Sequence, residues 1–174
     1  MAAPGTAMKH AGASATLSFR VGITDPHALR LGHFMGRWSS IELSVEGIIW
    51  DLAGLPPEVG RVFTRRLEMR SKRDLIQGLL EVATTPREAR TCWKRADDRI
   101  ERLAPTVASL THGHWLAGPR PDHGHVIGRP DLDRVGTSAA PAAVTYTLQD
   151  LDARIAEVED ILGVLAELAG MLQG

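Results

Sequence analysis

The sequence has few of the features that assign a function directly. Its 174 residues include one cysteine, Cys92, so no disulfide can form within the chain, and we expect a protein of the reducing cytoplasm. Cys92 stands beside Trp93 at a core-like helix position, where we expect it to be buried and unreactive. No apolar run approaches the roughly 18–20 residues needed to cross a bilayer, so we expect no membrane partner.

The chain also lacks an excess of charge and the common catalytic motifs. Twenty Lys and Arg residues nearly cancel twenty-one Asp and Glu residues, so any surface that binds anions has to come from local clustering. The sequence contains no Gly-rich phosphate-binding loop, no Gly-x-Ser-x-Gly, no His-Glu-x-x-His and no dinucleotide fingerprint. We therefore expect no cofactor.

What the sequence has is helical periodicity. Residues 1–17 are rich in Ala, Gly and Ser and are predicted to be a disordered tail, and residues 18–174 are predicted to form a single domain. The first helix is expected to follow Asp25 as its cap and to end at Gly54 and the two prolines after it. Its apolar residues alternate by four and three: Phe34, Trp38, Ile41, Val45, Ile48 and Leu52.

Two further helices follow. The second is predicted over residues 57–83, with a kink or a fresh start near Met69, because Ser71 and Asp74 have the spacing of a capping box. The third is expected after Thr85, which heads another capping box with Pro86 just inside it. Pro105 is expected to interrupt this third helix.

The rest of the chain predicts a short β-structure and a last helix. Residues 116–143 hold many Gly and Pro residues, with one irregular hairpin pairing 115–116 with 126–127 and a short strand at 144–146. Thr147 and Asp150 form a third capping box, which begins a helix with an acidic face that runs to the C-terminus. The sequence therefore predicts an all-α bundle of four to five helices with a small irregular hairpin before the C-terminal helix.

One motif connects the chain to a family. The segment Ser109-Leu110-Thr111-His112-Gly113-His114-Trp115 resembles the Arg-Asn-x-x-x-His-Gly-x-Trp signature of helical bacterial and phage proteins related to the HEPN superfamily. The order of elements is similar too: a helix bearing Trp38 and Glu42, a long basic helix, a helix leading into the histidine, and a terminal helix. The resemblance extends over about residues 34–172, but its specific part is this short motif.

The resemblance implies a helical bundle that often dimerises near the motif and, in active members, cuts RNA without a metal. The family's arginine holds the scissile phosphate, and its histidine moves a proton to or from the 2′-hydroxyl or the leaving oxygen. Here Val107 and Ala108 stand in place of the arginine and asparagine, while His112 remains as the catalytic candidate. We therefore expect a homodimeric, RNA-associated accessory or defence-type protein that is impaired in cleavage.

The second helix could supply a cation in place of the missing arginine, because basic residues crowd positions 61–73. Helical projection places three of them opposite the apolar stripe, as an ordinary solvated face: Arg61, Arg65 and Lys72. It places Arg66 and Arg70 within the stripe, where a charge needs a counter-ion, a ligand or a partner subunit. Glu42 and Glu46 are the natural counter-ions. With His114, these two arginines are the candidate contacts to an RNA phosphate.

Two other functions stay open. The first is a non-catalytic helical interaction or dimerisation module, with the last helix as the docking surface for a partner protein or a second copy. The second is a metal-binding protein, because two His-Gly-His pairs on a hairpin would bring four imidazoles together. No cysteine or clear acidic ligand accompanies these histidines, so we expect no metal. The alternative ligands are His112, His114, His123 and His125.

Overall fold

The computed structural model describes residues 22–117, 123–127 and 143–173. The described helices are α1 (Asp25–Ala53), α2 (Pro57–Thr64), α3 (Met69–Val82), α4 (Arg87–His112) and α5 (Leu148–Gln173). The described strands are β1 (His114–Ala117), β2 (His123–Ile127) and β3 (Ala143–Thr147). These elements form an all-α bundle with a small sheet before the last helix, which confirms the predicted fold class. The predicted tail at 1–17 lies outside the described residues.

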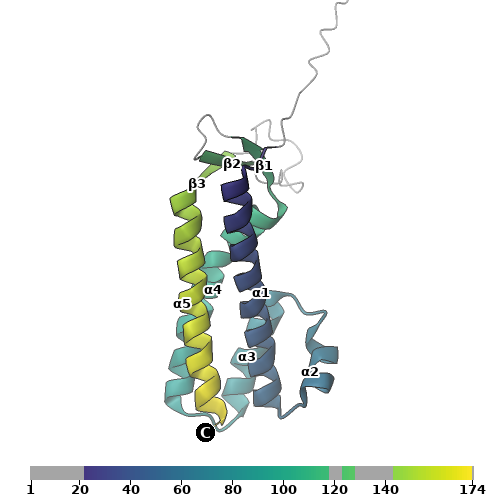
Figure 1. Ribbon diagram of the computed structural model, residues 1–174. Helices are drawn as coiled ribbons and strands as arrows, with labels where there is room; N and C mark the ends of the chain where they lie inside the picture. The colour runs from purple at the N-terminus through teal and green to yellow at the C-terminus, as the bar shows by residue number, and fades with distance from the viewer. Residues whose placement is uncertain (1–21, 118–122, 128–142, 174) are drawn as a thin grey trace, which may run out of the picture.

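The long helices α1 and α5 lie side by side, with α4 behind them, as Figure 1 shows. Their predicted stripes make the core: from α1 Phe34, Trp38, Ile41, Val45 and Ile48, and from α5 Leu151, Val158, Ile161, Leu165 and Leu168. Each such side chain contributes roughly 1.5–3 kcal/mol by leaving water. None of the described helices has the length and apolarity needed to cross a bilayer.

The ends of α1 follow the sequence signals in part. Gly54 adopts a left-handed φ of 62° just after the helix, which only glycine takes without strain, so the predicted stop is confirmed. The predicted cap is wrong, because Thr24 is the N-cap and Asp25 lies in the first turn. The Thr24 hydroxyl does not cap the backbone either, since it forms a 2.7 Å hydrogen bond with Nδ1 of His27.

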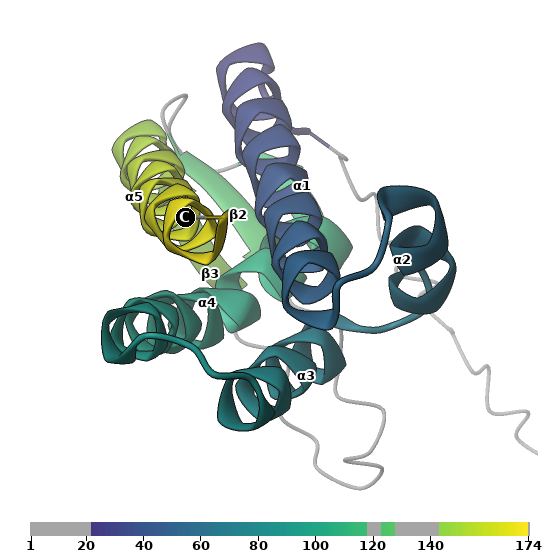
Figure 2. The same cartoon turned by 90° about the horizontal axis from the view of Figure 1, so that it is seen from below.

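The predicted fresh start after the first half of the second helix is confirmed, since α2 and α3 are separate helices. The predicted capping box at Ser71 and Asp74 is wrong. The helix α3 begins two residues before Ser71, with Glu68 as an N-cap that makes no side-chain hydrogen bond. Because the chain leaves helical geometry between Thr64 and Met69, the two helices do not share one phase. Figure 2 shows α2 at the outer edge of the bundle, beside α1.

The helix α4 departs from prediction at two points. Thr85 does not cap it, because its hydroxyl donates to the carbonyl oxygen of Leu80 at 3.3 Å and accepts from Nε of Arg90 at 3.2 Å. Pro105 does not interrupt it either, and the helix continues to His112. Pro105 is exposed, while Leu103 and Leu110 on its two sides are buried, so core packing holds the helix through the lost backbone hydrogen bond.

The three strands form one antiparallel sheet in the order β1-β2-β3, at the end of the bundle where α5 begins (Figure 1). Trp115 pairs with Val126, and Val126 pairs with Val144, which confirms the predicted hairpin and the predicted strand. The third capping box is also confirmed. The amide of Thr147 donates to Oδ2 of Asp150 at 2.8 Å, and the amide of Asp150 donates to Oγ1 of Thr147 at 3.0 Å.

Candidate functional site

The HEPN-like motif forms the junction between α4 and β1. His112 is the last residue of α4 and is exposed, and the amide of Gly113 closes the helix by donating to the carbonyl oxygen of Ser109 at 2.9 Å. Nε1 of Trp115 then donates to the carbonyl oxygen of Leu110 at 3.3 Å, which ties the first strand back onto the helix. The motif therefore has a structural role at this junction.

A group of rings lies behind the motif. Trp115 lies against His27 and Tyr146, with ring centroids 6.3 and 6.2 Å away. A Cβ added to Gly124 would lie 2.8 Å from Trp115 and 3.1 Å from His27, so the glycine between His123 and His125 is required by packing. His27 is fully buried and was missed by sequence reasoning, although its seven-residue spacing from Phe34 continues the apolar stripe.

The position where the resembled signature has its arginine lies against the core here. Val107 is half-buried and packs against the core cluster, and Ala108 is exposed beside it. Thr111 turns its hydroxyl to the carbonyl oxygen of Val107 at 2.7 Å and to Sδ of Met35 at 3.5 Å. Within the described residues, the side chain of His112 makes neither a hydrogen bond nor an ion pair.

The two arginines proposed as substitutes do not lie where helical projection put them. Arg66 and Arg70 are exposed and belong to the α2–α3 connection and the first turn of α3. The buried cation is Lys72, whose Nζ donates to Oε1 of Glu46 at 2.6 Å, so its predicted solvated position is wrong. The projection assumed one continuous helix, and the break before Met69 changes which residues face α1.

Trp38 and Glu42, which the resemblance places together on the first helix as supporting residues, contact each other. Glu42 accepts a 3.2 Å hydrogen bond from Nε1 of Trp38, one turn earlier on α1, and does not act as the counter-ion of an arginine. Arg73, which sequence reasoning did not single out, joins α3 to α4 by pairing with Asp97 and Glu101. The hydrogen bond to Asp97 raises the pKa of the Arg73 guanidinium.

The last helix has an apolar stripe and an acidic face, and the two lie in different surroundings. Its apolar stripe is buried inside the bundle, and much of its acidic face pairs with arginines of α1 and α4. These pairs are Arg30–Asp152, Arg37–Glu159, Arg95–Glu167 and Arg99–Asp160. The apolar stripe of the C-terminal helix is therefore covered by the chain's own helices, while the paired carboxylates on its acidic face stay about half exposed or more.

Four arginines of the α2–α3 region remain available to a ligand. They are exposed, and none forms an ion pair with a residue in the described ranges: Arg61, Arg65, Arg66 and Arg70. An unpaired guanidinium offers a planar fork of donors to a phosphate or a carboxylate. These four arginines form a local basic cluster, which can bind an anion although the net charge of the chain is close to zero.

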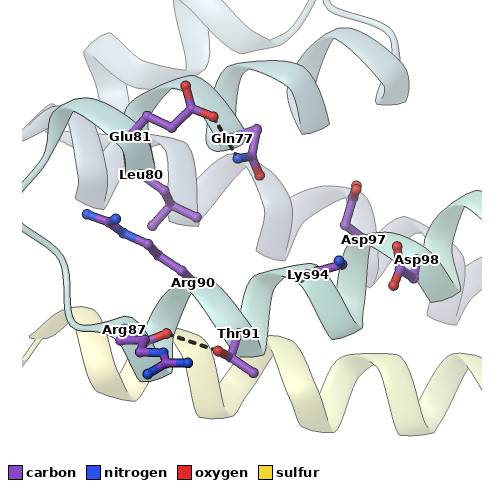
Figure 3. A pocket seen from close by; sticks show the side chains of 9 residues that line it. All are labelled: Gln77, Leu80, Glu81, Arg87, Arg90, Thr91, Lys94, Asp97 and Asp98. Carbon is purple, nitrogen blue, oxygen red and sulfur yellow. Dashed lines mark hydrogen bonds between the residues drawn. The ribbon is translucent and has the colours of Figure 1, made fainter.

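A groove of about 580 Å³ lies between α3 and α4. Figure 3 shows Arg90 extending from α4 toward α3, and Gln77 and Glu81 hydrogen-bonded to each other on α3. Its lining mixes both charges: Gln77, Leu80, Glu81, Arg87, Arg90, Thr91, Lys94, Asp97 and Asp98. Sequence reasoning missed it, although spacings of three and four put Arg87, Arg90 and Lys94 on one face of α4.

The histidines do not converge in the described part of the chain. Across the β1–β2 ladder His114 faces Ile127, so His123 lies four residues further along β2, roughly 13 Å away at the rise of a strand. Among the residues that the structure describes, no three His, Cys, Asp or Glu side chains form a group able to hold a metal ion. The side chain of His125 lies outside that description.

Cys92 matches its predicted position. It is buried on α4, its thiol donates to the carbonyl oxygen of Val164 on α5 at 3.4 Å, and burial raises the pKa of the thiol. A raised pKa keeps the group as a thiol at neutral pH, and thiols are poor nucleophiles and poor metal ligands. The geometry of Cys92 thus favours a packing role.

No family model, curated protein or solved structure matches the chain.

The two groups that metal-free RNA cleavage requires, an imidazole and a cation, lie on different elements among the described residues. His112 at the end of α4 offers an imidazole, the side chain that most often transfers protons in general acid–base catalysis. Arg66 and Arg70 offer anion binding, and no hydrogen bond joins either of them to His112. Within the described residues, the anion-binding guanidiniums and the His112 imidazole therefore belong to different elements.

Proposed function

We propose that this chain is a HEPN-like accessory or defence-type protein that associates with RNA and is impaired in cleaving it. The observation that carries the proposal is the place of Val107, half-buried against the core where the resembled signature has its arginine. Without the arginine of the signature, the exposed His112 lacks the residue that stabilises the charge of the transition state in the resembled family. Removing one such donor from an enzyme typically costs about 10²–10³ in rate.

RNA association is supported by the exposed, unpaired side chains of Arg66 and Arg70. Guanidinium groups bind phosphates through paired hydrogen bonds, and such contacts release counterions. We include in this proposal the homodimer that the resemblance implies, with His114 beside His112 as a further phosphate contact. We place the protein in the cytoplasm, since Cys92 is the chain's single cysteine and is not part of a disulfide.

The test is a titration of labelled single-stranded RNA, followed by fluorescence anisotropy at two salt concentrations. Arg66→Gln with Arg70→Gln should weaken binding at least about tenfold and reduce the logarithmic salt slope by roughly 1.4, which is two single-strand phosphate contacts. The control is Arg87→Gln with Arg102→Gln, two exposed arginines of α4 that also lack an ion pair with a described residue. Equal losses in both variants would contradict a specific RNA contact.

The second candidate, a non-catalytic interaction module, is favoured by a different observation. Three large apolar side chains of α2 are exposed on one stripe: Val59, Val62 and Phe63. RNA phosphates would not cover them. The two functions are compatible, because the apolar stripe and the pair Arg66 and Arg70 are different side chains of the same region.

A further inference from the structure

The helix α2 packs against the bundle through its smallest residues. Gly60 and Thr64 are buried, and Nε1 of Trp50 donates to Oγ1 of Thr64 at 3.2 Å. A Cβ on Gly60 would lie 2.3 Å from Cδ1 of Trp50, so only glycine permits this approach. The inward face of α2 is thus occupied by small side chains, and its larger residues point elsewhere.

The larger apolar residues face away from the bundle. Val59, Val62 and Phe63, which we call the α2 stripe, follow the i, i+3, i+4 spacing that puts side chains on one helix face. Their exposed fractions are 43%, 61% and 65%. A single exposed apolar residue is ordinary, but three on one face of a two-turn helix form a continuous patch of the kind that marks an interface.

A basic edge borders the stripe. Arg61 and the C-cap residue Arg65 are four residues apart and, at 100° per residue, lie with the exposed Glu58 on a third face of α2 next to Val62. Neither forms an ion pair with a described residue, whereas Arg30, Arg37 and other arginines of the bundle are paired with carboxylates. The stripe and its edge therefore offer an apolar surface beside two free positive charges.

We propose that the α2 stripe is the docking site of an amphipathic helix from a partner protein, with acidic residues beside its apolar face. The apolar face would cover Val59, Val62 and Phe63, and its carboxylates would pair with Arg61 and Arg65. The eight residues of α2 extend about 12 Å, which matches roughly two turns of such a helix. This inference is independent of RNA association, which rests on Arg66 and Arg70.

The charges argue against other occupants. A second copy docking on the same stripe with its α2 antiparallel would bring its own Arg61 and Arg65 to the same side as those of the first, and like charges repel across an interface. RNA phosphates would satisfy the arginines but leave Val59 and Val62 in water, so an RNA ligand does not account for the stripe. An acidic, apolar helix satisfies both features at once.

The experiment titrates the full chain with a labelled helical peptide that has leucines on one face and glutamates beside them. Val62→Ser with Phe63→Ser should weaken binding at least about tenfold, the loss expected when anchors of a small interface are removed. The control variant, Leu29→Ser with Val82→Ser, removes two exposed apolar residues elsewhere and should leave binding unchanged. Arg61→Glu with Arg65→Glu should abolish binding of this peptide and create binding of a matched peptide with lysines in place of glutamates.

Circular dichroism and thermal unfolding establish that each variant is folded before its binding is compared. Peptide binding that is unchanged in the Val62→Ser and Phe63→Ser variant, or that shows no preference between the two peptides, overturns the proposal. So does binding of anionic vesicles or self-association in sedimentation that disappears with the same variant while no peptide binds. The RNA titration is read separately: its failure removes the proposed function and leaves the peptide result intact.

Discussion

Nζ of Lys72 lies 2.6 Å from Oε1 of Glu46, and this ion pair joins α3 to α1. The pair is largely buried, since the two side chains are only 9% and 14% exposed. Two charges so far from water are tolerated because each neutralises the other. Removing one of them leaves the other without a counter-ion, which costs more than the pair itself contributes. The pair thus determines how α3 sits on α1.

We predict that Glu46→Gln lowers the free energy of unfolding by about 3 kcal/mol, because it leaves the Lys72 ammonium buried and uncompensated. Lys72→Met combined with Glu46→Leu should restore stability to within about 1 kcal/mol of the wild type, since an apolar pair of similar size replaces the ion pair. Urea unfolding of the wild type, Glu46→Leu, Lys72→Met and their double variant completes a double-mutant cycle, and Glu46→Gln is measured beside it. Simple additivity of the two single changes would show that the pair is not coupled.

The contact between α2 and Trp50 predicts opposite effects for two glycines. Gly60→Ala should destabilise the protein by about 1–3 kcal/mol, because its Cβ would meet the indole ring. Gly78→Ala, in the exposed interior of α3 with nothing within 4 Å, should stabilise it by about 0.5–1 kcal/mol. Thermal unfolding of both variants is the measurement, and a Gly60→Ala variant as stable as the wild type would mean that α2 does not pack on Trp50 as described.

Thr147 and Ser71 both have the spacing of a capping box, but replacing them with alanine should change the stability of the protein by different amounts. Thr147→Ala should cost about 1 kcal/mol, since Thr147 caps α5 through the amide of Asp150. Ser71→Ala should change stability by less than about 0.5 kcal/mol, because Ser71 is exposed inside α3 and caps nothing. Chemical unfolding curves of the two variants are the measurement. A cost at Ser71 equal to that at Thr147 would contradict the observed start of α3.

The same cap predicts a pH dependence. The backbone hydrogen bond from Thr147, together with its hydroxyl, holds the pKa of the Asp150 carboxyl below its ordinary value. A lowered folded-state pKa makes the contribution complete above the unfolded pKa of roughly 3.9 and progressively lost as the pH falls through the folded value. The stability difference between wild type and Asp150→Ala should therefore be constant from pH 8 to 6 and shrink below about pH 4. A difference that grows on acidification would contradict this sign.

The proposed loss of cleavage predicts a measurable recovery. With chelator present, the wild type should cleave a fluorogenic RNA weakly or not at all. Val107→Arg with Ala108→Asn should raise the rate by about 10²-fold, because a positioned guanidinium restores stabilisation of the phosphate in the transition state. His112→Ala in that background should abolish the gain. If the double variant is folded and dimeric but gains no His112-dependent activity, the nuclease ancestry should be dropped.

Much of this fold was present in local sequence signals. The four-three spacing from Phe34 to Leu52 set the α1 stripe, Gly54 set its end, and the Thr147 box set the start of α5. The hairpin followed from the turn-rich stretch between two short apolar pairs. Each of these signals acts over a few residues, through helix phase, backbone freedom at glycine or a hydrogen bond three positions away, so it can be read without knowing the rest of the chain.

The candidate site could be read from the sequence only in part. Its residue types were visible, but which cation is buried was not: Lys72 pairs with Glu46, and Arg66 and Arg70 face water, because the break before Met69 resets the phase of α3. Thr85 has the same capping-box spacing as Thr147, yet it does not cap α4, because its hydroxyl is hydrogen-bonded to the carbonyl oxygen of Leu80 and to Nε of Arg90.

The periodicity of the sequence by itself determined where the helices lie and which of their faces are apolar. Only the tertiary structure decided which charges are paired, which caps form, and that α2 turns its small residues inward and its large apolar ones to solvent. The physical reason is that these outcomes depend on contacts between helices distant in the chain. There a single close approach, such as Gly60 on Trp50, determines which face is covered.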